Sequence, residues 1–303
     1  MRIGIDLGGH TLTAALVSEP DGELLPRVER IKTRNTPPGR GVREVMQAMA
    51  DVVESLADGS GDVISIGVAV PGALDAARRR SLRLSNFPKE WDDLDLLRTF
   101  GDVLKARRIS AQIYIENDAN CYALGEWRAG EAIGVSDFVV FTMGTGIGCG
   151  IITGGELLTG AHGMAAEGGH LVIGGDIPCG CGGRGHAETL AAADGTAARA
   201  AAKGIPADFG ELWAMRGSAD ADEVLETTLD AMARTIASVC HLLDPELVII
   251  GGGMSQADGI GKALYERTLP YMSYPFKGLL DLRISKLGNE APLYGAAGMG
   301  HIA

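Results

Sequence analysis

Two cysteines and two histidines lie close together in one glycine-rich stretch of this 303-residue chain. Cys179 and Cys181 are followed by His186, and His170 precedes Cys179 by nine residues. A structural zinc ion takes four such nitrogen and sulfur ligands in a tetrahedral shell. The intervening glycines let a short loop wrap tightly enough to bring both thiolates to one ion. The stretch therefore predicts a structural zinc site, with four protein ligands and no open position for water.

The composition predicts a large buried core and argues against two classes of partner. Hydrophobic residues make up 46% of the chain, and the formal net charge is −12. Double-stranded nucleic acid should be repelled, because phosphate binding needs clustered Lys and Arg. No membrane span is expected, because no apolar run reaches about 18 residues. We expect a cytoplasmic protein without a leader segment, in which Cys121, Cys149 and Cys240 remain free thiols.

Strand and helix patterns alternate along the chain, which predicts an α/β class with partly parallel sheets. A strand–glycine–strand unit opens the chain at residues 2–18, and a second one follows at residues 138–153. We therefore expect two similar domains around a central cleft. The smaller would comprise residues 1–118 plus about 290–303, and the larger residues 119–289 with the zinc loop. Apolar spacing predicts a helix over 42–56, the alanine-rich run 191–202 is expected to form one helix, and Asp21-Gly22 indicates a turn.

Glycine-rich turns follow predicted strands at three places. One such turn is usually only a tight hairpin, but three of them favour phosphate binding, because backbone N–H groups can approach an anion there. The candidate phosphate-binding residues are Gly8, Gly9, His10, Thr11, Gly144, Thr145, Gly146, Gly252 and Gly253. Asp6 ends the first strand and would face Mg²⁺ through water, the alternative being a turn-capping aspartate.

Asn117-Asp118 follows another short strand and precedes a predicted helix. An acceptor hydroxyl in phosphoryl transfer needs a carboxylate that orients it and takes its proton, and Asp118 is placed for this. A helix N-cap would also use an aspartate at this point. Spacing alone leaves both interpretations open.

The chain resembles the ROK family of sugar kinases and sugar-responsive repressors. That family carries Glu-x-Gly-His and then Cys-x-Cys-Gly-x-x-Gly-Cys-x-Glu. The matching residues here are Glu167, Gly169, His170, Cys179, Cys181, Gly182, Gly185 and Glu188. His186 replaces the family's usual third cysteine, and imidazole is also a zinc ligand. His10 replaces the usual threonine of the first glycine turn, so either His10 or Thr11 would contact phosphate. The likeness runs through almost the whole chain, to Tyr294-Gly-Ala-Ala-Gly298.

The resemblance implies a two-domain actin-like ATPase (ribonuclease H-like) fold and an ATP-dependent hexose kinase. Asp118 would be the catalytic base for transfer of the γ-phosphoryl group to a primary hydroxyl, with glucose the expected hexose. The implied hexose-binding residues are Gly72, Asn86, Asn117, Asp118, Glu167, His170 and Glu188. His170 would bind zinc through one ring nitrogen and a sugar hydroxyl through the other. ATP, Mg²⁺ and structural zinc are the implied cofactors, and a homodimer the implied assembly.

Two alternatives to a glucose kinase remain. One is a kinase for mannose, fructose, allose or an N-acetylhexosamine. The other is a sugar-sensing regulator without its own DNA-binding domain. Repressors of the family carry an N-terminal helix-turn-helix, whereas this acidic chain opens on the first strand of the ATPase fold. That difference favours the kinase.

Overall fold

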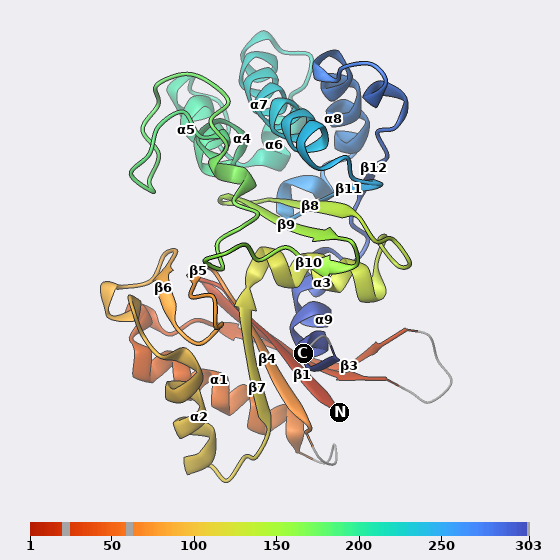
Figure 1. The fold of residues 1–303 in the computed structure, drawn as a ribbon. Helices are drawn as coiled ribbons and strands as arrows, with labels where there is room; N and C mark the ends of the chain where they lie inside the picture. Colours follow the sequence, from red (N-terminus) through yellow and green to blue (C-terminus); the bar gives the residue numbers. More distant parts are fainter. Residues whose placement is uncertain (20–24, 59–62, 302–303) are drawn as a thin grey trace. The chain divides into compact units, whose positions relative to one another are not determined.

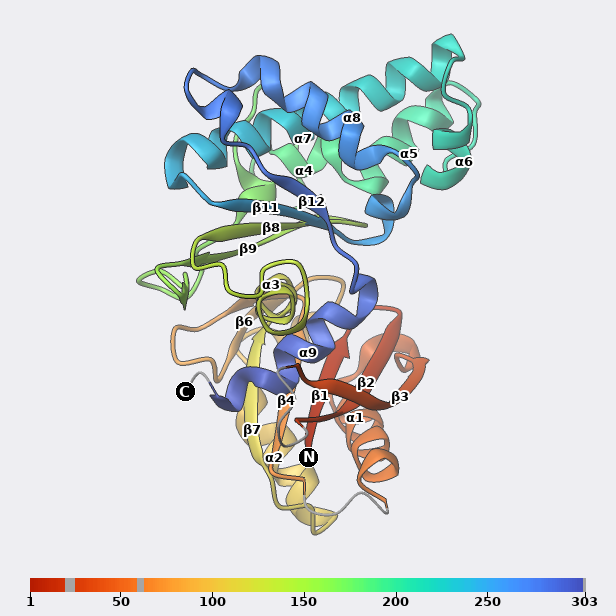
Figure 2. The same ribbon diagram turned by 90° about the vertical axis from the view of Figure 1, so that its right-hand side faces the viewer.

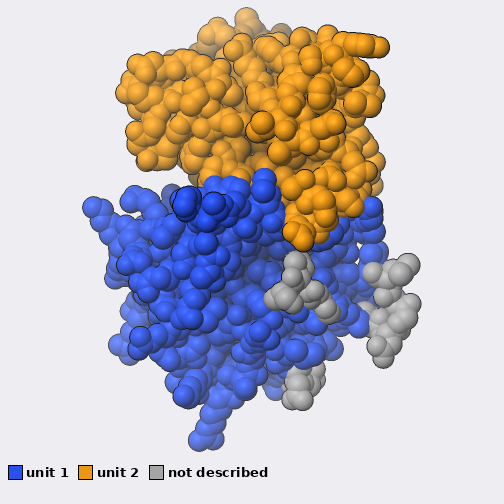
Figure 3. Space-filling model, in the orientation of Figure 1, with its two compact units in different colours: residues 1–134, 157–165, 289–303 blue, residues 135–156, 166–288 orange. Residues whose placement is uncertain are grey.

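The computed structural model describes residues 1–19, 25–58 and 63–301, so the predicted turn at Asp21-Gly22 lies outside the described residues. The chain divides into two compact units, which are coloured separately in Figure 3. Unit 1 comprises Met1–Gly134, Leu157–Ala165 and Asn289–Ala303. Unit 2 comprises Val135–Glu156 and Ala166–Gly288.

Unit 1 is built on a five-stranded sheet with the strand order β3-β2-β1-β4-β7, all labelled in Figure 2. Its strands are β1 (Arg2–Leu7), β2 (Thr11–Ser18), β3 (Arg27–Asn35), β4 (Ser65–Val70) and β7 (Gln112–Asn117). The first three are antiparallel neighbours, whereas β4 and β7 run parallel to β1. The predicted opening pair of strands is confirmed at residues 2–7 and 11–18. A separate hairpin joins β5 (Gly72–Leu74) to β6 (Ser81–Leu84).

Alternate residues of these strands face two different helical layers. Ile3, Ile5 and Leu7 of β1 belong to a core that includes α1 (Val42–Ala57) and α2 (Leu96–Ala106). Ala15 and Val17 of β2 belong to a second cluster with α9 (Ala291–Gly298). This is the period-two pattern of a sheet that is covered on both faces.

Glycines bring α3 (Asp118–Ala129) and α9 into backbone contact (Figure 2). A methyl group added at Gly125 of α3 would lie 1.9 Å from the carbonyl oxygen of Ala291, and one at Gly295 of α9 would lie 1.8 Å from that of Cys121. This packing groups α3 with unit 1. The division differs here from the one expected from sequence, in which the second domain began at residue 119.

Unit 2 contains a second five-stranded sheet, in the order β10-β9-β8-β11-β12. Its strands are β8 (Phe138–Met143), β9 (Ile147–Thr153), β10 (Glu156–Leu157), β11 (Leu247–Gly251) and β12 (Leu282–Ile284). As in unit 1, an antiparallel pair is extended by two parallel strands, here β11 and β12 beside β8. The recurrence of this pattern confirms the expectation of two similar α/β halves.

The helices of unit 2 lie on one side of its sheet in Figure 1. They are α4 (Ala187–Ala191), α5 (Ala193–Ala202), α6 (Phe209–Ala214), α7 (Ala219–Leu243) and α8 (Ile260–Thr268). Within the described ranges, no helix is both long enough and apolar enough to cross a bilayer.

Helix propensity predicted one helix over the alanine-rich run 191–202, and this prediction is wrong. The chain breaks at Ala192, whose ψ of 162° is extended, and α4 and α5 meet there at a corner. The N–H of Ala193 donates to the carbonyl of Gly144 at 2.9 Å. Gly195 allows the corner, because an added methyl group would lie 2.1 Å from the carbonyl oxygen of Thr189. Tertiary contacts have overridden local propensity here.

The contact between α3 and α9 predicts opposite effects for two glycine-to-alanine changes within helices of unit 1. Gly125→Ala should lower the free energy of unfolding by about 1–3 kcal/mol, the usual cost of overpacking. Gly101→Ala in α2 is the matched control, because its methyl group would have only an ordinary contact, 3.6 Å from Ile113. That change should raise the stability by up to about 1 kcal/mol through helix propensity. Denaturant unfolding would measure both, and equal effects would contradict the packing argument.

Candidate functional site

The first glycine turn of unit 1 is closed by its own backbone and anchored by two side chains. The N–H of Gly8 donates to the carbonyl of Thr11 at 2.8 Å, and the Thr36 hydroxyl donates to the Gly8 carbonyl at 2.7 Å. Nε of Arg40 donates to the Gly9 carbonyl at 2.6 Å. His10 and Thr11 are both exposed at the tip. The turn is therefore preorganised, with both candidate phosphate contacts accessible.

Arg40 also joins this turn to the loop that carries Asn86. Its Nη1 donates to the Asn86 carbonyl at 2.9 Å, and an added methyl group at Gly9 would lie 3.1 Å from Cβ of Asn86. A predicted phosphate-binding turn and a predicted hexose ligand are thus neighbours within one unit. Sequence reasoning missed Thr36 and Arg40, since no local motif marks residues that donate to a distant carbonyl.

Asp6 lies near the carboxyl end of β1. Asp118 is the first residue of α3, directly after the carboxyl end of β7. The two strands belong to the parallel part of the same sheet, with β4 between them. Burial, with repulsion from the Asp118 carboxylate adding to it, raises the pKa of Asp6 to about 7. A cation held beside Asp6 would relieve both effects, because it favours the charged form of each carboxylate.

The N-cap of α3 is Asn117, not Asp118. Oδ1 of Asn117 accepts from the N–H groups of Ala119 at 2.9 Å and Asn120 at 3.1 Å. Its Nδ2 donates to the Gly72 carbonyl at 3.1 Å, so two predicted hexose ligands are joined directly. An amide nitrogen has two hydrogens, and the second is available to a ligand. Asp118 occupies the first turn of the helix, where the helix dipole stabilises its negative charge.

A buried ion pair lies directly behind Asn117 and Asp118. Nε of Arg78 donates to Oε2 of Glu116 at 2.7 Å, with side chains that are 17% and 6% exposed. Oε1 of Glu116 accepts from the N–H of Asn117 at 2.7 Å and from Nδ2 of Asn120 at 3.0 Å. Nη1 of Arg78 donates to the Gly163 carbonyl at 2.7 Å. The pair therefore ties the Asn117-Asp118 junction to the segment Leu157–Ala165 of the same unit.

Sequence reasoning missed this pair as well. Glu116 carried one signal, a carboxylate at the end of an otherwise largely apolar strand beside Asn117. Arg78 carried none, because it is one of three consecutive arginines between β5 and β6, and only its tertiary contacts with Glu116 and Gly163 distinguish it.

In unit 2, the other two glycine turns lie side by side at the ends of the parallel strands β8 and β11. An added methyl group at Gly252 would lie 2.5 Å from the carbonyl oxygen of Met143, the last residue of β8. The N–H of Gly144 donates to the Gly146 carbonyl at 3.0 Å. The predicted phosphate-binding residues Gly144, Thr145, Gly146, Gly252 and Gly253 are therefore brought together. The turn comprises only residues 144–146, because Ile147 already belongs to β9.

The four predicted zinc ligands converge in unit 2. Their donor atoms, from His170, Cys179, Cys181 and His186, all lie within 4.8 Å of one another. Sγ of Cys181 lies 3.2 Å from Nδ1 of His186. Ligand atoms of a tetrahedral zinc site are about 3.3–3.8 Å apart, so a contraction of about 1 Å would complete the shell. Nδ1 of His170 is buried with no hydrogen-bond partner among the described residues, as expected for a ring nitrogen that awaits a metal.

Short turns shape this cluster. The N–H of Cys179 donates to the Gly183 carbonyl at 2.8 Å, and the N–H of Gly182 donates back to the Cys179 carbonyl at 2.9 Å. Gly183 leaves room for the imidazole, since an added methyl group would lie 2.4 Å from Cε1 of His186.

Glu188 connects the zinc-ligand cluster with the Gly144–Gly146 turn. Its Oε2 accepts from the N–H of Ile147 at 3.0 Å, and an added methyl group at Gly146 would lie 2.4 Å from the same oxygen. Its Oε1 lies 4.0 Å from Sγ of Cys179. Glu167 is exposed, and its Oε2 lies 3.7 Å from Nε2 of His170. Partial desolvation of its half-exposed carboxyl group raises the pKa of Glu167, with His170 opposing and Glu188 reinforcing the shift.

The Arg78–Glu116 pair leads to a stability prediction. Arg78→Met should lower the free energy of unfolding by about 3–5 kcal/mol, because it leaves the Glu116 carboxylate buried without its cation. Arg79→Met is the matched control, since Arg79 is exposed and its partner is the surface residue Asp95. Exposed ion pairs contribute little, so the control should unfold almost as the wild type does. Similar losses for the two variants in denaturant unfolding would show that the buried pair is unimportant.

Known proteins resemble this chain along its whole length. The model of the ROK family matches residues 2–301. The glucokinase of Thermotoga maritima is 36% identical over 97% of this chain and 95% of its own. The N-acetylmannosamine kinase of Escherichia coli O157:H7 is 31% identical over 97% and 96%. The crystal structure of a ROK family glucokinase from Streptomyces griseus, in complex with glucose and AMPPNP, matches with a TM-score of 0.82 at 27% identity over 98% of both chains. The chain therefore belongs to the ROK family and has its actin-like ATPase fold.

Proposed function

We propose that this protein is an ATP-dependent hexose kinase that transfers the γ-phosphoryl group of ATP to the primary hydroxyl of glucose. Its family membership over residues 2–301 and the similarity to glucokinases support the reaction class. The N-acetylmannosamine kinase of Escherichia coli makes an N-acetylhexosamine the second candidate acceptor.

The observation that carries the proposal is the position of Asp118. Asn117 is the N-cap of α3, and Asp118 in the first turn accepts from the N–H of Ala119 through Oδ1 at 2.9 Å. Asp118 follows the carboxyl end of a parallel strand, where open α/β sheets bind their ligands. A carboxylate there can orient the acceptor hydroxyl and take its proton. Glu116 and Arg78 hold the preceding residue from behind.

The donor would be bound by the residues of the glycine turns. Asp6 would face Mg²⁺, which neutralises charge on the transferred phosphoryl group when it is bound. The raised pKa of Asp6 fits a carboxyl group that is fully ionised only beside a cation. Backbone N–H groups of Gly9 in unit 1 and of Thr145 and Gly146 in unit 2 would bind phosphate oxygens, because those of Gly8 and Gly144 close their own turns.

The proposed hexose ligands are polar groups with firmly held positions. Asn117 is bonded to Gly72, Asn86 is joined to Arg40, and Glu188 is bonded to Ile147. Glu167 and His170 complete the proposed set. Fixed polar groups of this kind give hexose specificity, because each ring hydroxyl is both donor and acceptor.

The zinc ion would be structural. Two thiolates and two imidazoles make up its complete shell, so the metal would hold the loop 170–186 and orient His170. We also propose a cytoplasmic location, which suits Cys121, Cys149 and Cys240 as free thiols outside the zinc-ligand cluster. The homodimer remains a prediction from family resemblance.

A panel of hexoses in a coupled ADP-release assay tests the function. Glucose should give the highest kcat/KM, ahead of mannose, fructose, allose and N-acetylmannosamine, and ATP without sugar should be hydrolysed slowly. Preference for N-acetylmannosamine would move the assignment to the second acceptor. Sugar binding without ADP release from ATP, whichever hexose is present, would instead indicate a sensor protein.

Asp118→Asn should lower kcat by about 10² or more, because it keeps the shape but removes the proton acceptor. The KM for glucose should change far less. Asp102→Asn on the exposed face of α2 is the control and should leave both constants unchanged. Turnover by Asp118→Asn near the wild-type rate would place the base at another residue.

Metal analysis of the purified protein should give about one zinc per chain, and Cys179→Ala should lose both the metal and thermal stability, since metal binding is coupled to folding. His186→Cys should retain zinc, because the new thiolate replaces one ligand with another. Cys240→Ala, a buried thiol of α7 outside the zinc-ligand cluster, is the control and should retain zinc. Full stability and activity of metal-free protein would overturn the zinc proposal.

A further inference from the structure

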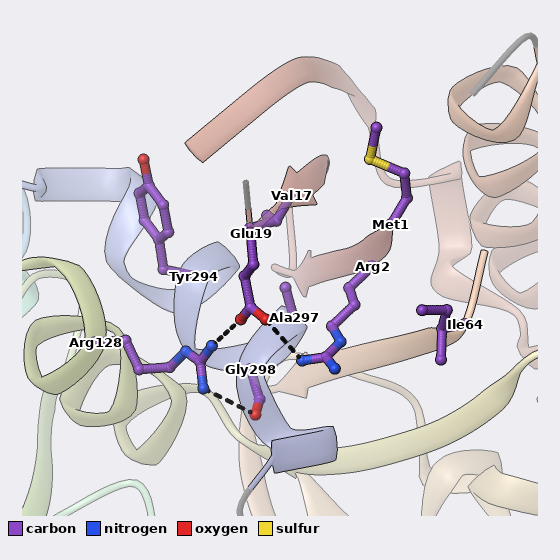
Figure 4. A pocket seen from close by; sticks show the side chains of 9 residues that line it. All are labelled: Met1, Arg2, Val17, Glu19, Ile64, Arg128, Tyr294, Ala297 and Gly298. Atoms are coloured by element: carbon purple, nitrogen blue, oxygen red, sulfur yellow. Dashed lines mark hydrogen bonds and ion pairs between the residues drawn. The ribbon is translucent and has the colours of Figure 1, made fainter. Parts of the chain in front are cut away.

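A polar pocket of unit 1 is drawn in Figure 4, and its residue Arg2 lies at the end of β1 opposite Asp6. Arg2 begins β1, whereas Asp6 lies near the end of the same strand. The pocket has a volume of about 130 Å³ and contains Arg2, Glu19 and Arg128, with Tyr294, Ala297 and Gly298 of α9 beside them. None of these residues belongs to the proposed kinase site.

Two guanidinium groups converge on one carboxylate in this pocket. Nη1 of Arg2 lies 3.5 Å from Oε2 of Glu19, and Nη2 of Arg128 pairs with Oε1 of the same carboxylate. Figure 4 shows Glu19 between the two arginines. The arginine side chains are 17% and 18% exposed, whereas Glu19 is 37% exposed. The two guanidinium groups are thus largely buried in the lining of the pocket, whereas the Glu19 carboxylate lies nearer to the solvent.

Among the described residues, the carboxylate leaves one buried nitrogen of each guanidinium group without a hydrogen-bond acceptor. These nitrogens are Nη1 of Arg2 and Nε of Arg128. Nη1 of Arg128 reaches the Gly298 carbonyl only at 3.4 Å. The three side chains have a net charge of +1 in a chain whose net charge is −12. Burial and the charge of Arg2 lower the pKa of Arg128, while Glu19 opposes that shift.

We propose that this pocket is a binding site for a phosphate or phosphomonoester dianion, and that Glu19 takes its place when no such ligand is bound. A dianion matches two guanidinium groups in charge, whereas Glu19 matches one. Guanidinium forks suit the oxygens of a tetrahedral phosphate, which would accept from the buried nitrogens that lack an acceptor. Glu19, partly exposed beyond the end of β2, would turn into the solvent as the ligand enters.

The proposal is independent of the proposed kinase activity, because it uses only residues remote from Asp6 in β1 and from Asp118 in α3. Inorganic phosphate and a sugar phosphate share the chemistry that the pocket recognises. Only the sugar phosphate carries an ester group. For it to bind, this group would have to extend through the solvent-exposed side of the pocket.

The test is the effect of inorganic phosphate on the melting temperatures of wild type and Glu19→Gln, at an ionic strength matched with chloride. Glu19→Gln removes the competing carboxylate, so phosphate should bind this variant about fivefold more tightly, or better, and stabilise it more than wild type. Glu29→Gln, an equal charge change on the exposed strand β3, is the control and should respond as wild type does. Adding Arg2→Gln to Glu19→Gln should abolish the extra response.

A second measurement covers the case in which Glu19→Gln does not fold. Inorganic phosphate and glucose 6-phosphate would be titrated calorimetrically into wild type and Arg128→Gln, with AMPPNP, Mg²⁺ and glucose present to occupy the proposed kinase site. Wild type should bind at least one of the two ligands, and the variant should bind it at least about tenfold more weakly. Binding of both ligands would show that the pocket admits an ester, and binding of phosphate alone would restrict it to the free anion. Equal phosphate responses of Glu19→Gln and Glu29→Gln, or equal binding by wild type and Arg128→Gln, would overturn the proposal and leave an internal ion pair.

Discussion

The backbone of α9 is in contact with β1, β4 and α3 at glycines, and the arrangement of unit 1 depends on this contact. A methyl group added at Gly4 of β1 or Gly67 of β4 would lie 2.0 Å or 1.8 Å from a carbonyl oxygen of α9. Gly125 and Gly295 bring α3 equally close to it. Because protein interiors are close-packed, these contacts with α9 fix the positions of β1 and α3 relative to each other, at both ends of each element. Asp6 and Asp118 belong to one end of these elements, and Arg2 and Arg128 to the other.

The proposed catalytic junction is supported from behind by charge as well as by packing. Glu116 accepts from Asn117 and Asn120 while paired with Arg78, so the carboxylate has few degrees of freedom left. A buried ion pair contributes little net stability, but removing one partner is costly. This asymmetry suits a site in which the position of Asp118 matters more than total stability. In unit 2, Glu188 has a similar connecting role between the Gly144–Gly146 turn and the zinc-ligand cluster.

Much of the fold and of the candidate site could be predicted from local patterns. The opening strands are at residues 2–7 and 11–18, the helix expected at 42–56 is observed as Val42–Ala57, and the four metal-ligand candidates lie within one short segment of the chain. Each of these follows from residue type and spacing over a few turns or strands. The α/β class and the two similar halves followed from the order of such segments.

What the sequence determined by itself was the chemistry within short segments: the period of each element, the glycine turns and the Cys/His stretch. Only the tertiary structure decided which distant groups meet. It assigned the helix cap to Asn117 and broke the alanine-rich run at Ala192. It also paired Arg78, one of three consecutive arginines, with the buried Glu116, and it brought Arg2 and Arg128 to one carboxylate. The physical reason is that local propensities amount to fractions of a kcal/mol per residue, whereas burying a charge or a backbone group without a partner costs several. Long-range packing therefore decides wherever the two conflict.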